Sequence, residues 1–281
     1  MQRTKIEYLS HTWNPIAMRC TPVSAGCDYC WHLRMANRLD GAFAKKALSN
    51  GPHFDVYADK SAAYSGGNPY LDQKELAAPL KLRKPAVIGV NFMGDLFHGY
   101  ITNDQIAEVF GLMAACSQHT FMVLTKRPKR MAEWFKWTNH GDEIANIYDN
   151  SGFGEFGFDW PLQNAWLGVS VEDQGTADDR IPVLLKTPAE KRFVSVEPML
   201  GPVDLNKREC LIDKTIFKFT IGNYLDWVIC GAETGPCSRT MDLNWAMDLH
   251  NQCVADNVPF FFKKDSYGNH ELDGRTWEGM P

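Results

Sequence analysis

The sequence lacks the marks of a membrane protein, a repeat protein or a general polyanion-binding protein. In its 281 residues no apolar run approaches the roughly 18 residues of a membrane-spanning helix. No internal repeat, low-complexity segment or clear linker is visible, which favours a single domain over residues 1–281. The net charge is −5, so any contact with nucleic acid requires a local basic patch.

We expect no secretory signal peptide, because the first ten residues carry charges and no apolar core. We therefore expect a cytoplasmic protein in a reducing compartment, where disulfide bonds are rare. Five of the eight cysteines are scattered, and each reads as a small buried apolar side chain. These are Cys116, Cys210, Cys230, Cys237 and Cys253.

The other three cysteines lie close together, in a loop that also contains Gly, Pro and Ser. Cys20, Cys27 and Cys30 have the spacing C-x6-C-x2-C. Soft thiolates at such spacing bind iron–sulfur clusters or zinc. Three thiols on a [4Fe-4S] cluster leave one iron open, and S-adenosylmethionine (SAM) is one molecule that such an iron can bind. The alternatives are a zinc site completed by His32 or His11, or a disulfide with one spare thiol.

Short apolar runs alternate with helical patterns through most of the chain. Runs typical of buried strands cover 86–93, 120–125, 165–171, 192–197, 227–231 and 258–262, with a less regular one at 6–16. Helices are expected at 31–48, 72–78, 105–117, 128–137, 176–185 and 243–256, with Asn103 or Asp104 as a cap. Turn-rich stretches near 51–80, 138–164 and 201–224 are expected to be insertions.

Strands that are apolar on both faces need helices on both sides, so the pattern predicts a parallel α/β fold. About seven βα units would form a partial or nearly closed parallel (βα) barrel. A doubly wound open sheet is the alternative.

Polar residues follow nearly every predicted strand, where parallel α/β folds gather functional groups. Glu172, Glu197 and Glu233 occupy equivalent positions after three strands. Such a ring of polar groups predicts a pocket for a polar cofactor, and it favours a cluster with SAM over structural zinc. Basic residues at 126–130 and 81–84 could hold phosphates or be solvated surface.

The segment Cys27-x-aromatic-Cys30 matches the second half of the radical-SAM signature, whereas the first gap has six residues instead of three. With six further motifs, the chain resembles the radical-SAM superfamily and, more closely, a phage and prophage family marked by three cysteines. The motifs are Thr12-Trp13-Asn14-Pro15, Gly94-Asp95-Leu96-Phe97-His98, Leu124-Thr125-Lys126-Arg127-Pro128, Gly168-Val169-Ser170-Val171-Glu172, Ser195-Val196-Glu197-Pro198 and Gly231-Ala232-Glu233-Thr234-Gly235. The resemblance extends from Thr12 to Arg275.

The resemblance implies a radical-SAM-like barrel with a [4Fe-4S] cluster on Cys20, Cys27 and Cys30. It places Tyr29 near the adenine of SAM, and it places Gly94 and Asp95 where a Gly-Gly-Glu motif, absent here, meets the methionine amino group. Further contacts to SAM are implied for Ser170, Glu172, Ser195 and Glu197. Asp95, His98 and Lys126 are the candidate catalytic residues.

The implied activity is one-electron cleavage of SAM, with an external electron donor, to a 5′-deoxyadenosyl radical. The expected substrate is a nucleic-acid base or a modified thymidine, rearranged during phage DNA hypermodification in the host cytoplasm. Two alternatives stay open: a DNA-repair enzyme of the photoproduct-lyase type, and a non-catalytic zinc-stabilised nucleic-acid-binding or adaptor protein.

Overall fold

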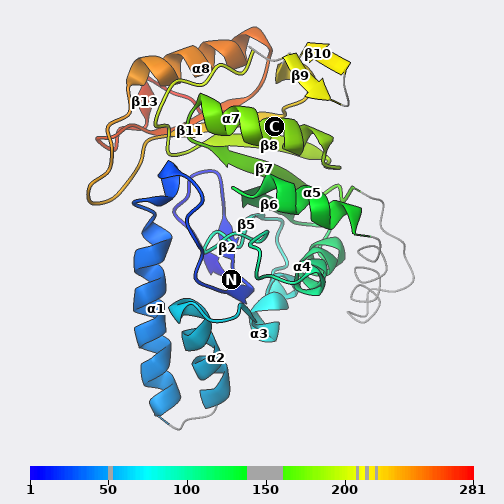
Figure 1. Cartoon of the computed structure of the whole chain (residues 1–281), viewed down its shortest axis with the longest axis vertical. Helices are drawn as coiled ribbons and strands as arrows, with labels where there is room; N and C mark the ends of the chain where they lie inside the picture. Colours follow the sequence, from blue (N-terminus) through cyan, green and yellow to red (C-terminus); the bar gives the residue numbers. More distant parts are fainter. Residues whose placement is uncertain (50–52, 138–160, 207–208, 213–214, 219–220) are drawn as a thin grey trace. The chain divides into compact units, whose positions relative to one another are not determined.

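The computed structural model describes residues 1–49, 53–137, 161–206, 209–212, 215–218 and 221–281 (Figure 1). The chain divides into two compact units. The N-terminal unit comprises Met1–Val23 and Cys30–Ala165, and the C-terminal unit comprises Ser24–Tyr29 and Trp166–Pro281. The middle of the cysteine loop therefore belongs to the same unit as the second half of the chain.

Four strands of the N-terminal unit follow the order β1-β2-β5-β6. β1 is antiparallel to β2, whereas β2, β5 and β6 are parallel to one another. Val90, the last residue of β5, pairs with both Trp13 of β2 and Val123 of β6, so these strands end at one edge. The bounds are β1 Gln2–Arg3, β2 His11–Trp13, β5 Val87–Val90 and β6 Thr120–Thr125, and a separate antiparallel pair joins β3 Ile16–Ala17 to β4 Tyr70–Leu71.

The helices of this unit include a hairpin that begins directly after Cys30. The long helix α1 packs along α2 through a small core of Ala36, Ala63 and Tyr64 (Figure 1). The bounds are α1 Trp31–Leu48, α2 Phe54–Ser65, α3 Gln73–Leu76, α4 Asn103–Ala115 and α5 Pro128–Lys136, with a 3-10 turn η2 at Pro79–Lys81.

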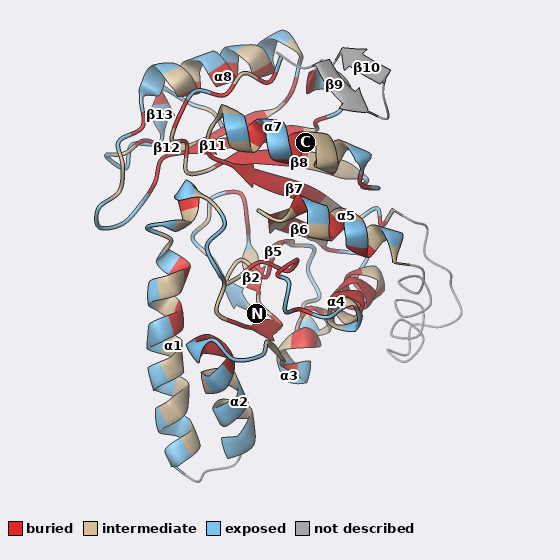
Figure 2. Ribbon diagram, viewed as in Figure 1, coloured by how far each residue is buried: buried red, intermediate tan, exposed pale blue. Residues whose placement is uncertain are grey.

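Four parallel strands of the C-terminal unit follow the order β7-β8-β11-β12 and are largely buried (Figure 2). Their bounds are β7 Ala165–Val171, β8 Lys191–Val196, β11 Trp227–Gly231 and β12 Phe260–Lys264. The helices are η1 Ala25–Cys27, α7 Gln174–Lys186, η3 Ile221–Asn223 and α8 Leu243–Ala255. Two short hairpins join β9 Glu209–Ile212 to β10 Thr215–Lys218 and β13 Glu271–Leu272 to β14 Arg275–Thr276.

One face of these strands is apolar at the start and polar at the end. Gly168 leaves room for the Phe193 ring, since a Cβ there would lie 2.4 Å from it. The Phe193 ring in turn packs on Trp227, with the ring centroids 6.0 Å apart. Because side chains alternate along a strand, Ser170 and Ser195 lie two residues further along the same face. On this face, aromatic side chains near the start of the strands are therefore followed by hydroxyl groups at their carboxyl ends.

The α/β class with mainly parallel strands is confirmed, and closure into a barrel remains a prediction. The strands at 120–125, 165–171 and 227–231 and the helix at 31–48 have the predicted bounds, and the remaining runs are shifted or shorter. The irregular run at 6–16 contains only the short strand β2 and the start of β3. Most of the predicted insertion at 138–164 lies outside the described residues.

Two local expectations are wrong. The stretch 51–80 was expected to be mostly turns, but it contains the 12-residue helix α2. The cap of α4 is Thr102 instead of Asn103 or Asp104, because its hydroxyl accepts a bond from the Gln105 N–H and the Gln105 side chain accepts one from the Thr102 N–H. Within the part of the chain that the structure describes, no helix is both long and apolar enough to cross a membrane.

Candidate cofactor site

The three clustered cysteines occupy three different local settings. Cys20 follows β3, Cys27 is the last residue of η1, and Cys30 directly precedes α1. None of the three forms a disulfide bond, and all three are of intermediate burial. Cys116, Cys230 and Cys253 are buried as expected, whereas Cys237 is exposed, so the expectation of a buried side chain is wrong there. Burial raises the pKa of the Cys116 thiol to about 11 and that of Cys253 to about 12, which keeps them protonated. The loop therefore offers the thiols that are best suited to metal binding.

His32 fixes the backbone at Cys20. The Cys20 N–H donates to His32 Nε2 at 3.1 Å, and the imidazole is buried. Burial, with a smaller effect from the charge of Arg19, lowers the pKa of His32 to about 4. His32 is therefore neutral, and its Nε2 is occupied as an acceptor, which leaves this nitrogen no lone pair for a metal.

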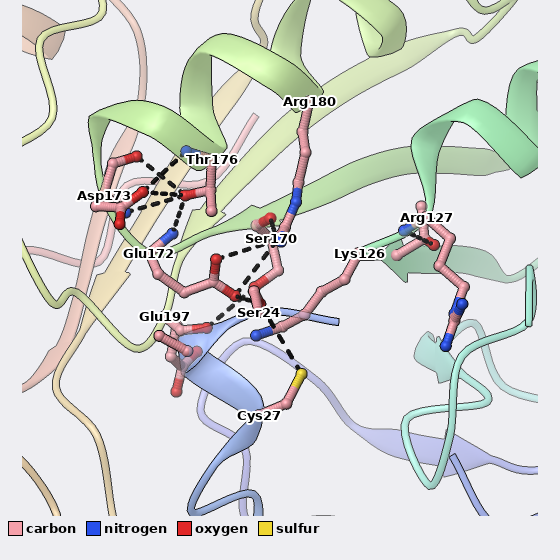
Figure 3. Close-up of polar contacts among 12 residues, drawn as sticks. Ser24, Cys27, Lys126, Arg127, Ser170, Glu172, Asp173, Thr176, Arg180 and Glu197 are labelled. Carbon is pink, nitrogen blue, oxygen red and sulfur yellow. Dashed lines mark hydrogen bonds and ion pairs between the residues drawn. The ribbon is translucent and has the colours of Figure 1, made fainter. Parts of the chain in front are cut away.

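A buried ion pair anchors the cysteine loop within the C-terminal unit (Figure 3). Ser24, three residues before Cys27, donates its hydroxyl to Glu172 Oε1 at 2.8 Å. Arg180 Nη1 lies 3.2 Å from Glu172 Oε2 and donates to the Ser170 carbonyl at 2.6 Å. Glu172 is 1% exposed and Arg180 4%. The carboxylate predicted to contact SAM is thus part of the scaffold that carries the loop.

Arg239 provides a second anchor for the same loop. Its guanidinium pairs with Glu233 in the fork geometry, with Nε 2.9 Å from Oε2, and Nη2 donates to the Ala25 carbonyl at 2.7 Å. Nη1 lies 3.5 Å from Asp28 Oδ2, and the group sits 5.2 Å from the centre of the Tyr29 ring. Tyr29 is 41% exposed. One arginine therefore contacts the loop at three residues.

In the N-terminal unit, Asp95 joins the ends of β5 and β6. Its carboxylate accepts bonds from the Thr125 hydroxyl at 2.7 Å, the Lys126 N–H at 3.0 Å and the Phe97 N–H at 3.0 Å. With three donors on a buried carboxylate, Asp95 is better suited to positioning than to proton transfer. Next to it, Gly94 is required for packing, since a Cβ there would lie 2.9 Å from Met18.

His98 connects the same strand end to Thr21, the residue after Cys20. The Tyr100 N–H donates to His98 Nδ1 at 3.3 Å, so in the neutral ring Nε2 carries the proton and donates to the Thr21 hydroxyl at 2.9 Å. Arg127 Nη2 donates to the same hydroxyl at 2.7 Å. Burial, then the Arg127 charge, lowers the pKa of His98, while Asp95 opposes this shift. His98 is therefore a hydrogen-bond donor at neutral pH.

The remaining predicted residues meet at the carboxyl edge of β7 and β8. Ser170 Oγ donates to the Glu197 carbonyl at 3.1 Å, and the neighbouring Ser195 Oγ is buried with no hydrogen-bond partner among the described residues. Lys263, at the end of β12, forms an ion pair with Glu197. Gly231 lies beside this pair, since a Cβ there would be 3.4 Å from Lys263 and 3.5 Å from Glu197.

The structure thus gathers the predicted residues into two groups, one in each unit. Sequence reasoning missed five residues that hold them: Thr21, Ser24, Arg180, Arg239 and Lys263. Only Lys263 carried a signal, as a polar residue directly after an apolar strand.

The cysteine loop supplies three thiols as candidate metal ligands. Among the residues that the structure describes, no group of three or more His, Cys, Asp or Glu side chains is placed to hold a metal ion. The Nε2 of His32 is occupied, and His11 stands at the start of β2, away from the strand end that leads to the loop. The three thiols of the loop are therefore not gathered into a preformed metal site among the described residues, and which metal they would bind belongs to the proposal below.

The chain belongs to the family described as "Protein of unknown function (DUF5131)", which matches residues 3–281. No curated protein and no solved structure matches it.

Proposed function

We propose that this member of the DUF5131 family is a radical SAM enzyme, built on a partial or nearly closed parallel (βα) barrel. In this proposal Cys20, Cys27 and Cys30 hold a [4Fe-4S] cluster. The observation that carries it is a loop with three partly exposed thiols outside any disulfide, whose backbone and neighbouring residues are held by His32, Glu172 and Arg239. When bound, the cluster would supply one electron from an external donor to break a sulfur–carbon bond of SAM.

The chain's own residues would bind and orient the cofactor. At the edge of β7 and β8, the Ser195 hydroxyl and the Glu197–Lys263 pair offer donors and acceptors to a polar, doubly charged group such as the methionine part of SAM. Tyr29 offers an exposed ring to the adenine. Glu172 would act through Ser24, as a positioning residue for the loop.

The residues predicted to be catalytic have separate roles in this proposal. Asp95 would hold the ends of β5 and β6 together, and His98 would fix Thr21 beside Cys20. Lys126 directly follows β6 and its backbone N–H donates to Asp95; in this proposal its ammonium group would contact substrate. The proposed substrate is a nucleic-acid base or modified thymidine, and the proposed reaction is an isomerisation in the host cytoplasm.

The test is cleavage of SAM by protein reconstituted with iron and sulfide without oxygen. With a chemical reductant, the wild type should release methionine and 5′-deoxyadenosine, which mass spectrometry detects. Cys27→Ala should release neither, whereas Cys237→Ala, which removes an exposed thiol outside the loop, should be as active as the wild type. Equal activity of Cys27→Ala and the wild type would refute the proposal.

The substrate is tested separately, because a repair enzyme of the photoproduct-lyase type would share the cofactor. Reconstituted protein is incubated with hypermodified phage DNA and with ultraviolet-irradiated DNA, and the nucleosides are compared by mass after digestion. A nucleoside of unchanged mass and altered retention in the hypermodified DNA supports isomerisation. Loss of thymine photoproducts alone supports repair instead.

A further inference from the structure

The exposed side of α1 carries positive charge in a protein whose net charge is negative. Arg34, Arg38 and Lys45 are all exposed and are spaced four and seven residues apart. Because 11 residues make about three helical turns, the three side chains lie along one side of the helix. We call these three residues the basic face of α1. The chain as a whole has a net charge of −5, so the composition does not account for this grouping.

The acidic groups of the hairpin have other positions. Asp40 is the one carboxylate in the sequence of α1, and it accepts a bond from the Ser61 hydroxyl of α2 at 2.6 Å. The exposed carboxylates Asp55 and Asp59 belong to α2. Asp40, six residues after Arg34, therefore lies on a different side of α1 from the basic face.

Gly41 lies between Arg38 and Lys45 on this side of the helix. It is exposed, and no atom lies within 4 Å of the position that its Cβ would occupy. Glycine inside a helix costs about 1 kcal/mol relative to alanine, and here no packing contact requires it. A glycine in the middle of a basic surface allows a partner's backbone to approach closely.

The basic clusters at 126–130 and 81–84 are less suitable for binding phosphates than the basic face of α1. Arg127 donates to Thr21, and Arg130 donates to Asn103 Oδ1 and to a backbone carbonyl, so both are used inside the fold. Lys81, Arg83 and Lys84 are exposed, but they precede β5 and therefore lie at the amino edge of its strands, opposite the edge that carries Asp95.

We infer that the basic face of α1 binds the phosphate backbone of the nucleic-acid substrate, an inference that rests on the proposed function. Between Arg34 and Lys45 the helix rises about 16 Å, the length of roughly five nucleotides at 3.4 Å per step. The helix begins at Trp31, directly after Cys30, so a strand lying along it ends beside the cysteine loop. Trp31 is 44% exposed and offers a ring on which a base can stack.

The test is the salt dependence of binding to a fluorescein-labelled oligonucleotide, single-stranded and as a duplex, followed by fluorescence anisotropy. The variant Arg34→Gln/Arg38→Gln/Lys45→Gln should bind about tenfold or more weakly at low salt, and its log–log salt slope should be smaller by about 2 for a single strand. The matched control Lys81→Gln/Arg83→Gln/Lys84→Gln removes the same charge from exposed positions and should bind like the wild type.

Iron content and SAM cleavage, measured on both variants, distinguish a failure of this inference from a failure of the proposed function. If the wild type binds nucleic acid and the α1 variant keeps the same slope, the inference is wrong while the proposed function stands. If the wild type cleaves SAM but binds no nucleic acid, both the inference and the nucleic-acid substrate are wrong. Vesicles of anionic lipid are tested in parallel: if the wild type binds them and neither oligonucleotide, a membrane is the partner and the inference is again overturned.

Discussion

Glu172 and Arg180 are buried charges that depend on each other. Removing one partner of a buried pair leaves the other charge uncompensated, so Glu172→Ala should lower the free energy of unfolding by about 3–5 kcal/mol. Urea denaturation measures this difference. Glu190→Gln, at an exposed carboxylate, is the control and should change stability by less than about 0.5 kcal/mol.

A double variant distinguishes the loss of charge pairing from the loss of packing. Glu172→Leu/Arg180→Met removes both charges and keeps the side-chain volume, so it should recover most of the lost stability. If the double variant is as unstable as Glu172→Ala, pairing is not the reason for the loss.

The lowered pKa of His98 predicts that the folded protein loses stability as the pH falls. Its pKa is lowered from the ordinary value of 6.5, so the unfolded chain takes up a proton here at a higher pH than the folded chain does. The stability that His98 contributes is complete above pH 6.5 and is lost as the pH falls below this value and through the lower pKa of the folded state. Protonation would also place a proton on Nδ1 against the Tyr100 N–H donor.

The measurement is urea denaturation of the wild type and His98→Gln at pH 8 and pH 5. Glutamine can accept from one neighbour and donate to the other, but it does not titrate. The wild type should lose more stability between the two pH values than the variant does. An equal loss in both proteins would contradict the assigned neutral state.

These residue roles were only partly predictable. A polar residue after an apolar strand can be recognised from the order of residues, which located Asp95, Glu172 and Glu197. Whether such a carboxylate faces a ligand or a buried arginine depends on tertiary contacts, such as the one that Arg180 makes from the next helix. No local pattern in the chain reports that contact.

At the scale of elements, the conformation of the cysteine loop depends on the Arg239 guanidinium, which contacts Glu233 and the Ala25 carbonyl together. Arg239→Lys keeps the charge but cannot contact Glu233 and the Ala25 carbonyl together in the same geometry. The amides of 25–29 should then exchange hydrogen about tenfold faster, the factor for about 1.4 kcal/mol. Arg275→Lys, at an exposed position in β14, is the control and should leave exchange in the loop unchanged.

Unchanged exchange in Arg239→Lys would show that Arg239 does not restrain the loop. A rise in exchange throughout the C-terminal unit would instead indicate global destabilisation. The predicted increase in exchange is therefore confined to the amides of 25–29.

The elements themselves were predicted where burial alone decides the structure. Runs such as 120–125 and 165–171 are apolar on both faces and end at a polar residue, so both ends of each strand are marked. The helix α2 was missed because it buries little besides Ala63 and Tyr64 and contains several weak helix formers. Its stability comes from packing on α1, which periodicity does not reveal.

For the whole molecule, the order of apolar runs predicted the α/β class, because parallel strands need helices on both faces. It did not predict the division into two units, in which Ser24–Tyr29 belongs with the second half of the chain. That assignment depends on Ser24 and Arg239 contacts across long sequence separations. The central proposal is that the cysteine loop holds a metal cluster.

The metal content of protein purified without oxygen tests that claim most directly. We expect a brown protein with about four iron and four sulfide per chain, as a [4Fe-4S] cluster requires. The metal should be lost in Cys27→Ala and kept in Cys237→Ala. A colourless protein with one zinc per chain, or unchanged iron in Cys27→Ala, would contradict the account.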